Sequence, residues 1–588
     1  MGHDPQPAAV VAVVLVTVAT VAIGAYGLRL SRTTSDFYVA SRAVSPRWNA
    51  SAIGGEYLSA ASFLGVAGLV LASGTDMLWF PVGYTAGYLV LLVLVAAPLR
   101  RSGAYTLPDF AEARLESPRA RVAASVLVVG IGWLYLVPQL QGAGIALRAV
   151  TGAPTWMGGA LVALVVVLNV VAGGMRSITF VQAFQYWLKL TAIAVPMFFI
   201  LLVWQSVGAP SPAAPGAALA QVDLTTTLAR TVTITSDVAT QVRVDGRVDG
   251  ARVHDTLAVA PGQRLELDTG TRVTVPKGEP VPRPVGAAAS DGESWLRPLS
   301  GASGRSHPLY STYSIVLALF FGTMGLPHVL VRFYTNPDGR AARRTPLTVI
   351  ALLGAFYLFP PLYGALGRVY AGDLLLGSRA DTVVLLLPSR VVPGLGGQLL
   401  SALTTAGAFA AFLSTSSGLV MSVSGVLHQD LLIWRRRAGV RQMPDTMRGF
   451  RGATLVSVAV PFVLSLFAGG LSLADTVGLA FAVAASTFCP LLVLGIWWRR
   501  LTRAGALAGL AVGGTLASCA VVVTMLSGVR HGWVGSLLAQ PAAWTVPIAF
   551  AVSVVVSLLT PRTLPPHVAR TMVRLHTPED VDVDRSSR

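Results

Sequence analysis

Few side chains in this sequence could place a charge inside an apolar segment. Glu56 is the one carboxylate that lies well inside such a run, and Lys189 lies inside another, where it shares a predicted helix face with Gln182 and Gln185. Charges inside a membrane span are costly and usually functional. The alternative for Glu56 is a structural hydrogen-bond partner at a helix break. For Lys189 the favoured interpretation is snorkelling or packing within the bundle.

Two apolar segments combine helix breakers with hydroxyl groups, over Gly54–Gly65 and over Phe321–His328. Irregular backbone at membrane depth is tolerated only where it is buried or lines a cavity. The freed carbonyls can bind a cation, and helix N-termini can face an anion. Glycines also serve close helix packing. Each segment opens a block of five expected spans, 47–204 and 309–498, which resembles an inverted repeat and favours transport.

A third segment, 398–427, has one small and hydroxyl-rich helical face. Such a face commonly serves packing, but its oxygens also suit a hard cation. The residues on this face are Thr404, Ala408, Ala411, Thr415, Gly418 and Ser422.

The composition indicates an integral membrane protein. The chain has 588 residues, of which only 12% are charged, against about 25% in a soluble domain. The net charge of +17 is better explained by arginines in short loops than by nucleic acid. Cys489 and Cys519 have neither metal-ligand nor disulfide spacing. A Gly-x-x-x-x-Gly-Lys-Ser/Thr motif is absent, which argues against ATP-driven pumping and, with the rest, against an enzyme.

About thirteen apolar runs are long enough to span a bilayer. Arginines alternate between the loops, which predicts a multi-pass protein of the plasma (inner) membrane with its N-terminus outside and its C-terminus cytoplasmic. The first run is expected to be a retained span, because its leader lacks basic residues. The expected units are an N-terminal span with a loop (1–46), a first five-helix block (47–204), an insert (205–308), a second five-helix block (309–498), and two further spans with a tail (499–588).

The insert, 205–308, is not expected to span the membrane. It opens Pro- and Ala-rich and continues with alternating stretches such as Thr231–Thr235 and Arg264–Asp268. Asp245-Gly246 and Asp249-Gly250 are turn formers. We expect a small β-rich module outside the cell, serving either as a spacer or as a binding site for a partner protein.

Several stretches also match a known family, most specifically the Leu326-Pro327-His328 motif. The matching stretches are Ser35–Arg42, Tyr57–Gly65, Tyr105–Phe110, Gln139–Gly144, Gly173–Met175 with Thr179 and Gln182, and Phe321–Thr335. On these residues the chain resembles the sodium:solute symporter family, and within it the cation–acetate (monocarboxylate) symporter branch, over about 35–500 apart from the insert. The resemblance implies an all-α bundle of LeuT type, with a five-plus-five inverted repeat.

The resemblance also implies a sodium site, with backbone carbonyls from the first broken helix and oxygens from the eighth core helix. Carried onto this chain, the ligands are Gly55, Leu58, Ala411, Ser414 and Thr415. The alternative is that the Ser414 and Thr415 hydroxyls bond to their own helix. The branch usually has Asp where Glu56 stands, which leaves open whether protons substitute for sodium as the coupling ion. No other cofactor is expected.

The expected substrate pocket lies between the two broken helices, and Gln139 could donate to a carboxylate there. No arginine is expected deep enough to clamp the anion. The candidate pocket residues are Ser59, Ser62, Gln139, Phe321 and Thr323.

The expected function is sodium-coupled uptake of a short monocarboxylate, such as acetate, propionate or pyruvate. The alternatives are another solute of the same family (an amino acid, a sugar or a vitamin) and a non-transporting sensor with the transporter fold. The short tail after 560 argues against a sensor.

Overall fold

The structure is a computed structural model. It describes residues 7–28, 45–213, 223–228, 231–236, 238–285, 295–299, 306–336, 338–376, 380–437, 446–468, 471–528, 532–578 and 581. The Ser35–Arg42 stretch used for the resemblance therefore lies outside the described residues.

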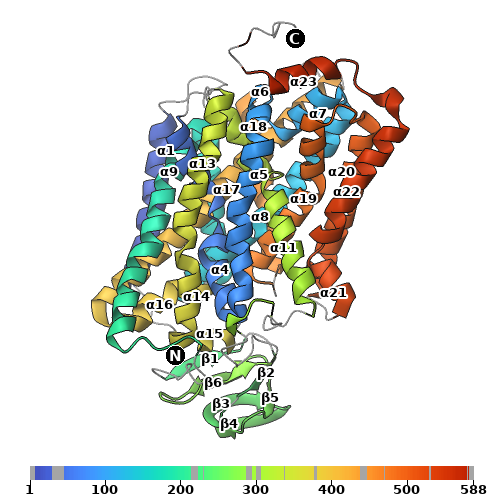
Figure 1. Cartoon of the computed structure of the whole chain (residues 1–588). Helices are drawn as coiled ribbons and strands as arrows, with labels where there is room; N and C mark the ends of the chain where they lie inside the picture. Colours follow the sequence, from blue (N-terminus) through green and yellow to red (C-terminus); the bar gives the residue numbers. More distant parts are fainter. Residues whose placement is uncertain are drawn as a thin grey trace.

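A bundle of long helices makes up most of the molecule (Figure 1). Before the insert, the helices are α1 (Pro7–Leu28), α3 (Pro46–Tyr57), a π-helical turn (Ala61–Gly65), α4 (Val66–Ser73), α5 (Trp79–Leu94), α6 (Ala96–Arg101), α7 (Leu107–Leu115), α8 (Pro118–Thr151) and α9 (Thr155–Ser206). After the insert come α11 (Pro308–Thr323), α12 (Pro327–Val331), α13 (Gly339–Tyr357), α14 (Phe359–Tyr370), α15 (Asp373–Leu376), α16 (Val383–Val391), α17 (Gly394–Arg437), α18 (Thr446–Phe467), α19 (Leu473–Trp497), α20 (Arg503–Ser527), α21 (Gly532–Ala539), α22 (Ala542–Leu559) and α23 (Val568–His576).

Within the described residues, eleven helical segments are long and apolar enough to cross a membrane, against about thirteen expected runs. The difference arises where helices are interrupted. The expected spans 47–73 and 77–99 appear as α3 followed by one continuous apolar segment, Ala61–Leu94. The expected span 155–174 contributes only a shorter apolar helix, Thr155–Val171. Gly174, at φ 58°, kinks α9 directly after it and adopts a conformation that favours glycine.

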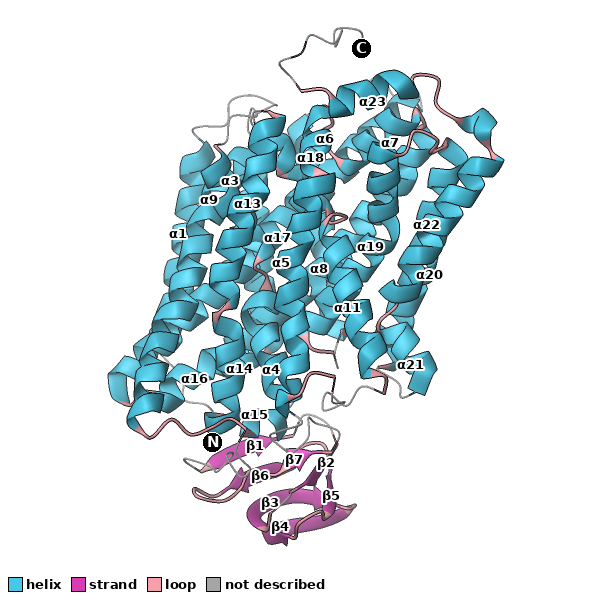
Figure 2. Cartoon of the chain, viewed as in Figure 1, coloured by secondary structure: helices cyan, strands magenta, loops and turns pink. Residues whose placement is uncertain are grey.

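Between α9 and α11 the chain forms an antiparallel sheet. Its strands are β1 (Leu224–Thr227), β2 (Val232–Thr235), β3 (Thr240–Val248), β4 (Ala251–Val259), β5 (Arg264–Leu267), β6 (Arg272–Val275) and β7 (Arg283–Pro284). They run in the order β1-β6-β3-β5-β2-β7, and β4 pairs with β3. The sheet has its own apolar cluster, which Leu376 of α15 joins. Figure 2 shows the strands gathered beside one end of the bundle.

Of the two turns expected in the β-sheet insert, one is confirmed and the other is wrong. Asp249 and Gly250 both have positive φ, 49° and 79°, and they connect β3 to β4 as a two-residue hairpin. The Asp245-Gly246 prediction is wrong, because both residues lie inside β3. Gly246 serves a close approach there: a Cβ on it would lie 2.6 Å from the Thr271 Cα.

The two ends of the bundle carry different elements. The sheet lies at one end, whereas α6, α7 and α23 lie at the other (Figure 1). Helix α6 carries Arg100 and Arg101, and α23 is the last described helix. The arginine pattern predicts that the insert lies outside and the C-terminus in the cytoplasm, which requires them at opposite ends of the bundle. Which end faces the cytoplasm remains a prediction.

A short segment after the sheet, 295–299, packs against the first broken helix. Trp295 is 3% exposed, and its indole Nε1 donates to the Val70 carbonyl of α4 at 3.2 Å. The Arg368 guanidinium of α14 lies 5.1 Å from the centroid of the same ring. The Thr75 hydroxyl donates to the Leu296 carbonyl at 2.9 Å. The segment therefore holds the sheet-side end of α4 in place.

We expect Trp295→Ala to lower the melting temperature of the purified protein clearly. Removing a buried aromatic side chain costs about 3–5 kcal/mol in soluble proteins. The matched control is Leu296→Ala, whose side chain is 47% exposed and whose contact to Thr75 uses the backbone. Equal melting temperatures for the two variants, measured by intrinsic fluorescence in detergent, would contradict this role for Trp295.

Candidate functional site

The first broken helix leaves helical geometry at Leu58, with φ −72° and ψ 84°. An interrupted helix leaves amides and carbonyls without their usual partners, and inside a bundle each must find another. The Ala60 amide donates to the Gln139 side-chain oxygen of α8 at 2.9 Å. The carbonyls of Gly55 and Leu58 both accept from Lys189 of α9. Side chains of neighbouring helices therefore complete the break.

Lys189 is fully buried, with 0% of its surface exposed. Its ammonium nitrogen lies 2.9 Å from the Leu58 carbonyl oxygen and 2.8 Å from Ser414 Oγ of α17. It also contacts the Gly55 carbonyl oxygen. These three acceptors match the three N–H donors of an ammonium. The side chain thus ends inside the bundle, and snorkelling does not describe it.

The two glutamines that share the expected helix face with Lys189 form hydrogen bonds to different helices. The Gln182 amide donates to the Ser414 carbonyl at 2.8 Å, so Gln182 and Lys189 both reach α17. The Gln185 amide instead donates to Thr20 Oγ1 of α1 at 3.1 Å. Gln185 therefore ties α9 to the first helix and lies outside the site.

Glu56, two residues before the break, forms a buried ion pair with Arg332. The Arg332 Nε lies 2.7 Å from Glu56 Oε2, and both side chains are at most 2% exposed. Arg332 also donates to Thr179 Oγ1 at 2.8 Å and to the Gln182 side-chain oxygen. No arginine was expected deep enough to clamp an anion, yet Arg332 is buried beside the break, where it pairs with Glu56. It follows α12 directly and turns inward, because a buried carboxylate needs a partner of opposite charge.

Helix α17 fits closely against the carboxylate and the break. A Cβ built on Gly418 would lie 1.8 Å from Glu56 Oε1, so only glycine leaves room there. The Thr415 hydroxyl donates to the Glu56 carbonyl at 2.5 Å. The Ser414 hydroxyl donates to the Ala411 carbonyl of its own helix at 3.0 Å.

All five residues of the expected sodium site thus converge on one place, but a side chain of this protein already lies there. Lys189 contacts three of the five expected ligand groups, those of Gly55, Leu58 and Ser414. The other two groups, of Ala411 and Thr415, have partners within the chain. With the Lys189 nitrogen between them, the Gly55, Leu58 and Ser414 oxygens leave no place for a sodium ion.

The second break lies between α11 and α12, where Leu326 is extended at φ −77° and ψ 116°. Thr323, at the end of α11, shares a hydrogen bond of 2.9 Å with the Tyr57 hydroxyl. Ser62 shares one of 2.7 Å with the Tyr357 hydroxyl of α13. Thr323 and Ser62 are therefore both engaged with tyrosines around the first break.

The remaining expected pocket residues are placed unevenly. Ser59 is 1% exposed and lies at the break itself. Gln139 is committed to the Ala60 amide through its oxygen. Phe321 packs instead in an apolar cluster with Ala542 and Val546 of α22. The structure therefore groups Ser59, Ser62, Gln139 and Thr323 around the first break but turns Phe321 toward the outer helices.

A cluster of aromatic side chains near both breaks was not anticipated. Ring contacts join Tyr57 to Tyr88 at 4.8 Å and Tyr135 to His328 at 5.1 Å between centroids, and Phe481 of α19 contacts both Tyr57 and Tyr135. The hydroxyl of Tyr88 and both ring nitrogens of His328 are buried without a hydrogen-bond partner among the described residues. The Leu-Pro-His motif was the available signal for His328, although it gave that residue no role.

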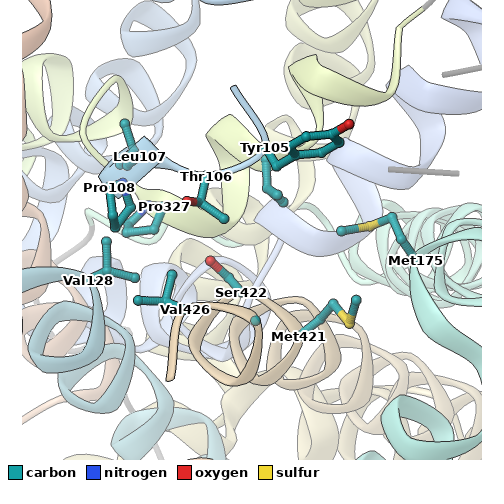
Figure 3. Close-up of a pocket in the computed structure, with 12 residues that line it drawn as sticks. Tyr105, Thr106, Leu107, Pro108, Val128, Met175, Pro327, Met421, Ser422 and Val426 are labelled. Atoms are coloured by element: carbon teal, nitrogen blue, oxygen red, sulfur yellow. The ribbon is translucent and has the colours of Figure 1, made fainter. Parts of the chain in front are cut away.

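A pocket lies between α7, α8, α12 and α17, and Figure 3 shows the side chains that line it. Tyr105, just before α7, is 42% exposed, whereas Met421 of α17 is 3% exposed. Pro327 and Val331 bring α12 to the wall, beside the buried His328. Ser422 lies on the wall too, as part of the small-residue face of α17. The pocket thus runs from the surface along the second broken helix.

Comparisons with known proteins agree with this arrangement. The model of the family described as "Sodium:solute symporter family" matches residues 37–244 and 295–513. Among curated relatives, an uncharacterised symporter of Cupriavidus necator is 30% identical, covering 90% of this chain and 88% of that protein. A monocarboxylic acid transporter of Corynebacterium glutamicum is 29% identical, covering 89% and 86%.

A solved structure is also similar, that of a Na⁺-coupled sialic acid symporter in a substrate-bound, outward-open state. Its TM-score to this chain is 0.59, and the match covers 94% of this chain and 97% of that one. Because the sequences are only 14% identical, the similarity concerns the fold alone.

We expect Gly418→Ala to destabilise the protein, because the new methyl group would displace the Glu56 carboxylate from its place against α17. The matched control is Gly130→Ala in α8, where a Cβ meets nothing within 4 Å. Melting temperatures in detergent should fall for the first variant only. Equal values would show that Glu56 moves freely.

We further expect Glu56 and Arg332 to be coupled energetically. Removing one partner of a buried pair costs about 3–5 kcal/mol because the other charge is left alone. The melting-temperature loss of the double variant Glu56→Gln/Arg332→Gln should therefore be smaller than the summed losses of the two single variants. Additive losses would rule out the coupling.

Proposed function

The chain belongs to the sodium:solute symporter family, and we propose that it is a secondary active symporter that carries a short monocarboxylate, such as acetate, propionate or pyruvate, by alternating access. The relative named a monocarboxylic acid transporter supports this substrate class, since it matches nearly the whole chain.

The observation that carries the proposal is the charge balance around the first break. Two basic side chains, Lys189 and Arg332, are buried there with one carboxylate, Glu56. With Lys189 as an ammonium, this network holds one positive charge in excess. Uncompensated charge is costly in a region without water, so a bound monovalent anion is stabilised there. A neutral sugar would gain nothing from this excess.

The surrounding side chains favour a small substrate. Aromatic rings of Tyr57, Tyr88 and Tyr135 crowd the space between the breaks. Among the described residues, the buried polar groups without partners there include the Ser59, Tyr84 and Tyr88 hydroxyls and the His328 imidazole. An apolar site with a few polar groups that fix orientation is the usual pattern for a small ligand. A carboxylate with a short apolar end suits it better than an amino acid, which would add an ammonium group to an excess of positive charge.

The pocket along α12 supports a route for the substrate. It joins the end that carries α7 to the neighbourhood of His328. Alternating access requires a site near the bilayer midplane that each side reaches in turn, and Pro327 at the second break lines this pocket. Accumulation against a gradient also requires a coupled cation, for which sodium and protons are the two candidates.

We expect the purified full-length protein in vesicles to exchange labelled pyruvate for unlabelled pyruvate. Acetate and propionate should compete, whereas amino acids, sugars and vitamins should not. Pyruvate is the better probe because it is a stronger acid than acetate, so less of it crosses the bilayer as the neutral molecule, and protein-free vesicles correct for the remainder. Exchange of an amino acid or sugar alone would overturn the substrate class, and a lack of any exchange would favour a sensor.

Two tyrosine variants, compared in the same assay, test the substrate site. We expect Tyr88→Phe to weaken pyruvate binding roughly tenfold or more, since a hydrogen bond to a charged group is worth about 1.5–3 kcal/mol. The matched control is Tyr370→Phe, which removes another buried hydroxyl without a described partner but lies at the end of α14. The KM for pyruvate exchange should rise in the first variant only. An unchanged KM for Tyr88→Phe would remove that hydroxyl from the substrate site.

A further inference from the structure

We propose that the Lys189 ammonium permanently takes the place of sodium in this chain, so that monocarboxylate transport by it does not depend on sodium. The transport part of this inference rests on the proposed function, whereas the statement about ion binding does not. The inference arises from a disagreement between the ligand set that the family resemblance implies and the side chain that the structure places within it.

The first argument is geometric. The Lys189 nitrogen lies within hydrogen-bond distance of the Leu58 carbonyl and Ser414 Oγ, at 2.9 and 2.8 Å, and it contacts the Gly55 carbonyl as well. An ion bound to the same three oxygens would have to lie where the nitrogen lies. Sodium and the Lys189 nitrogen therefore exclude each other from this place.

The second argument is electrostatic. Two unit positive charges a few ångströms apart repel strongly in a medium of low effective dielectric constant. The Glu56 carboxylate on α3 acts electrostatically on Lys189, and Arg332 pairs with that carboxylate. The Glu56 carboxylate is already paired with Arg332 at 2.7 Å, so it cannot also neutralise a sodium ion beside Lys189. Adding sodium would leave two excess positive charges in the network.

The third argument concerns the room for Lys189 to withdraw. Its side chain is 0% exposed, and α3, α9 and α17 enclose it. Tyrosine hydroxyls near α9 are engaged elsewhere: Tyr186 donates to the Leu352 carbonyl at 2.9 Å and Tyr363 to the Ile193 carbonyl at 3.1 Å. A withdrawn ammonium would therefore lose three acceptors without a described replacement, at a cost of several kcal/mol for a buried charge.

The consequence is a difference in what the cation can do. A sodium ion in this place can enter, hold the broken helix and leave with the substrate. The Lys189 ammonium makes the same contacts between α3, α9 and α17, but it is covalently attached and stays in the protein. The site then serves to hold the first break in shape, and the energy for uptake comes from a gradient other than that of sodium.

The test measures sodium binding and transport separately. Binding of radioactive ²²Na⁺ to the detergent-purified full chain needs no knowledge of the substrate. Pyruvate exchange and uptake are then measured in vesicles with sodium or with choline on both sides, with and without an imposed proton gradient. The variants are Lys189→Ala, which frees the three oxygens, and Gln185→Ala, a matched control one turn away whose side chain faces α1.

We expect no saturable ²²Na⁺ binding to the wild-type protein and pyruvate exchange that agrees within about twofold between sodium and choline. Lys189→Ala should gain saturable ²²Na⁺ binding, and Gln185→Ala should not. Saturable binding to the wild-type protein, or exchange that falls tenfold in choline, would overturn the inference. If Lys189→Ala does not fold, the wild-type measurements still decide. If the wild-type protein exchanges no monocarboxylate in either salt, the proposed function fails, and ²²Na⁺ binding alone decides the role of Lys189.

Discussion

The contact between the Lys189 ammonium and the backbone carbonyls of the first broken helix is the interaction on which the site depends. Breaking a helix inside an apolar bundle leaves backbone groups unpaired, and each costs several kcal/mol unless it finds a partner. Three helices supply those partners here: α9 through Lys189, α8 through Gln139 and α17 through Thr415. The break thereby becomes the point at which α3, α8, α9 and α17 are fixed relative to one another.

The same requirement explains the charges next to the break. Glu56 would be expensive alone, and its carboxylate reaches Arg332, which in turn bonds to Thr179 and to Gln182. Gly418 leaves space for that carboxylate against α17. The Glu56 carboxylate is thus accommodated by pairing with arginine. The proposed preference for a monovalent anion rests on this balance of two basic side chains and one carboxylate.

Composition and apolar run lengths were sufficient to predict a helical membrane bundle, and glycine-rich stretches located both breaks, because these are local properties of the chain. Long-range pairing was not predictable in the same way. Arg332 was not anticipated as a buried partner of Glu56, because hydropathy does not show that its side chain turns inward. Lys189 was flagged as an intramembrane charge, but its partners Gly55 and Ser414 are far away in sequence. The Asp245-Gly246 turn was wrong because both residues lie inside β3, where Gly246 approaches Thr271 closely. The packing of Phe321 beside α22 likewise depends on contacts between distant segments.

The central claim is that the protein's own lysine holds the first break while a carboxylate binds nearby. It is tested most directly by a high-resolution cryo-EM structure of the full chain in sodium chloride with saturating pyruvate. The account predicts density for the Lys189 side chain reaching the Gly55 and Leu58 carbonyls, and pyruvate beside Tyr88 and His328. A sodium ion coordinated by Gly55, Leu58, Ala411, Ser414 and Thr415, with Lys189 turned away, would contradict it.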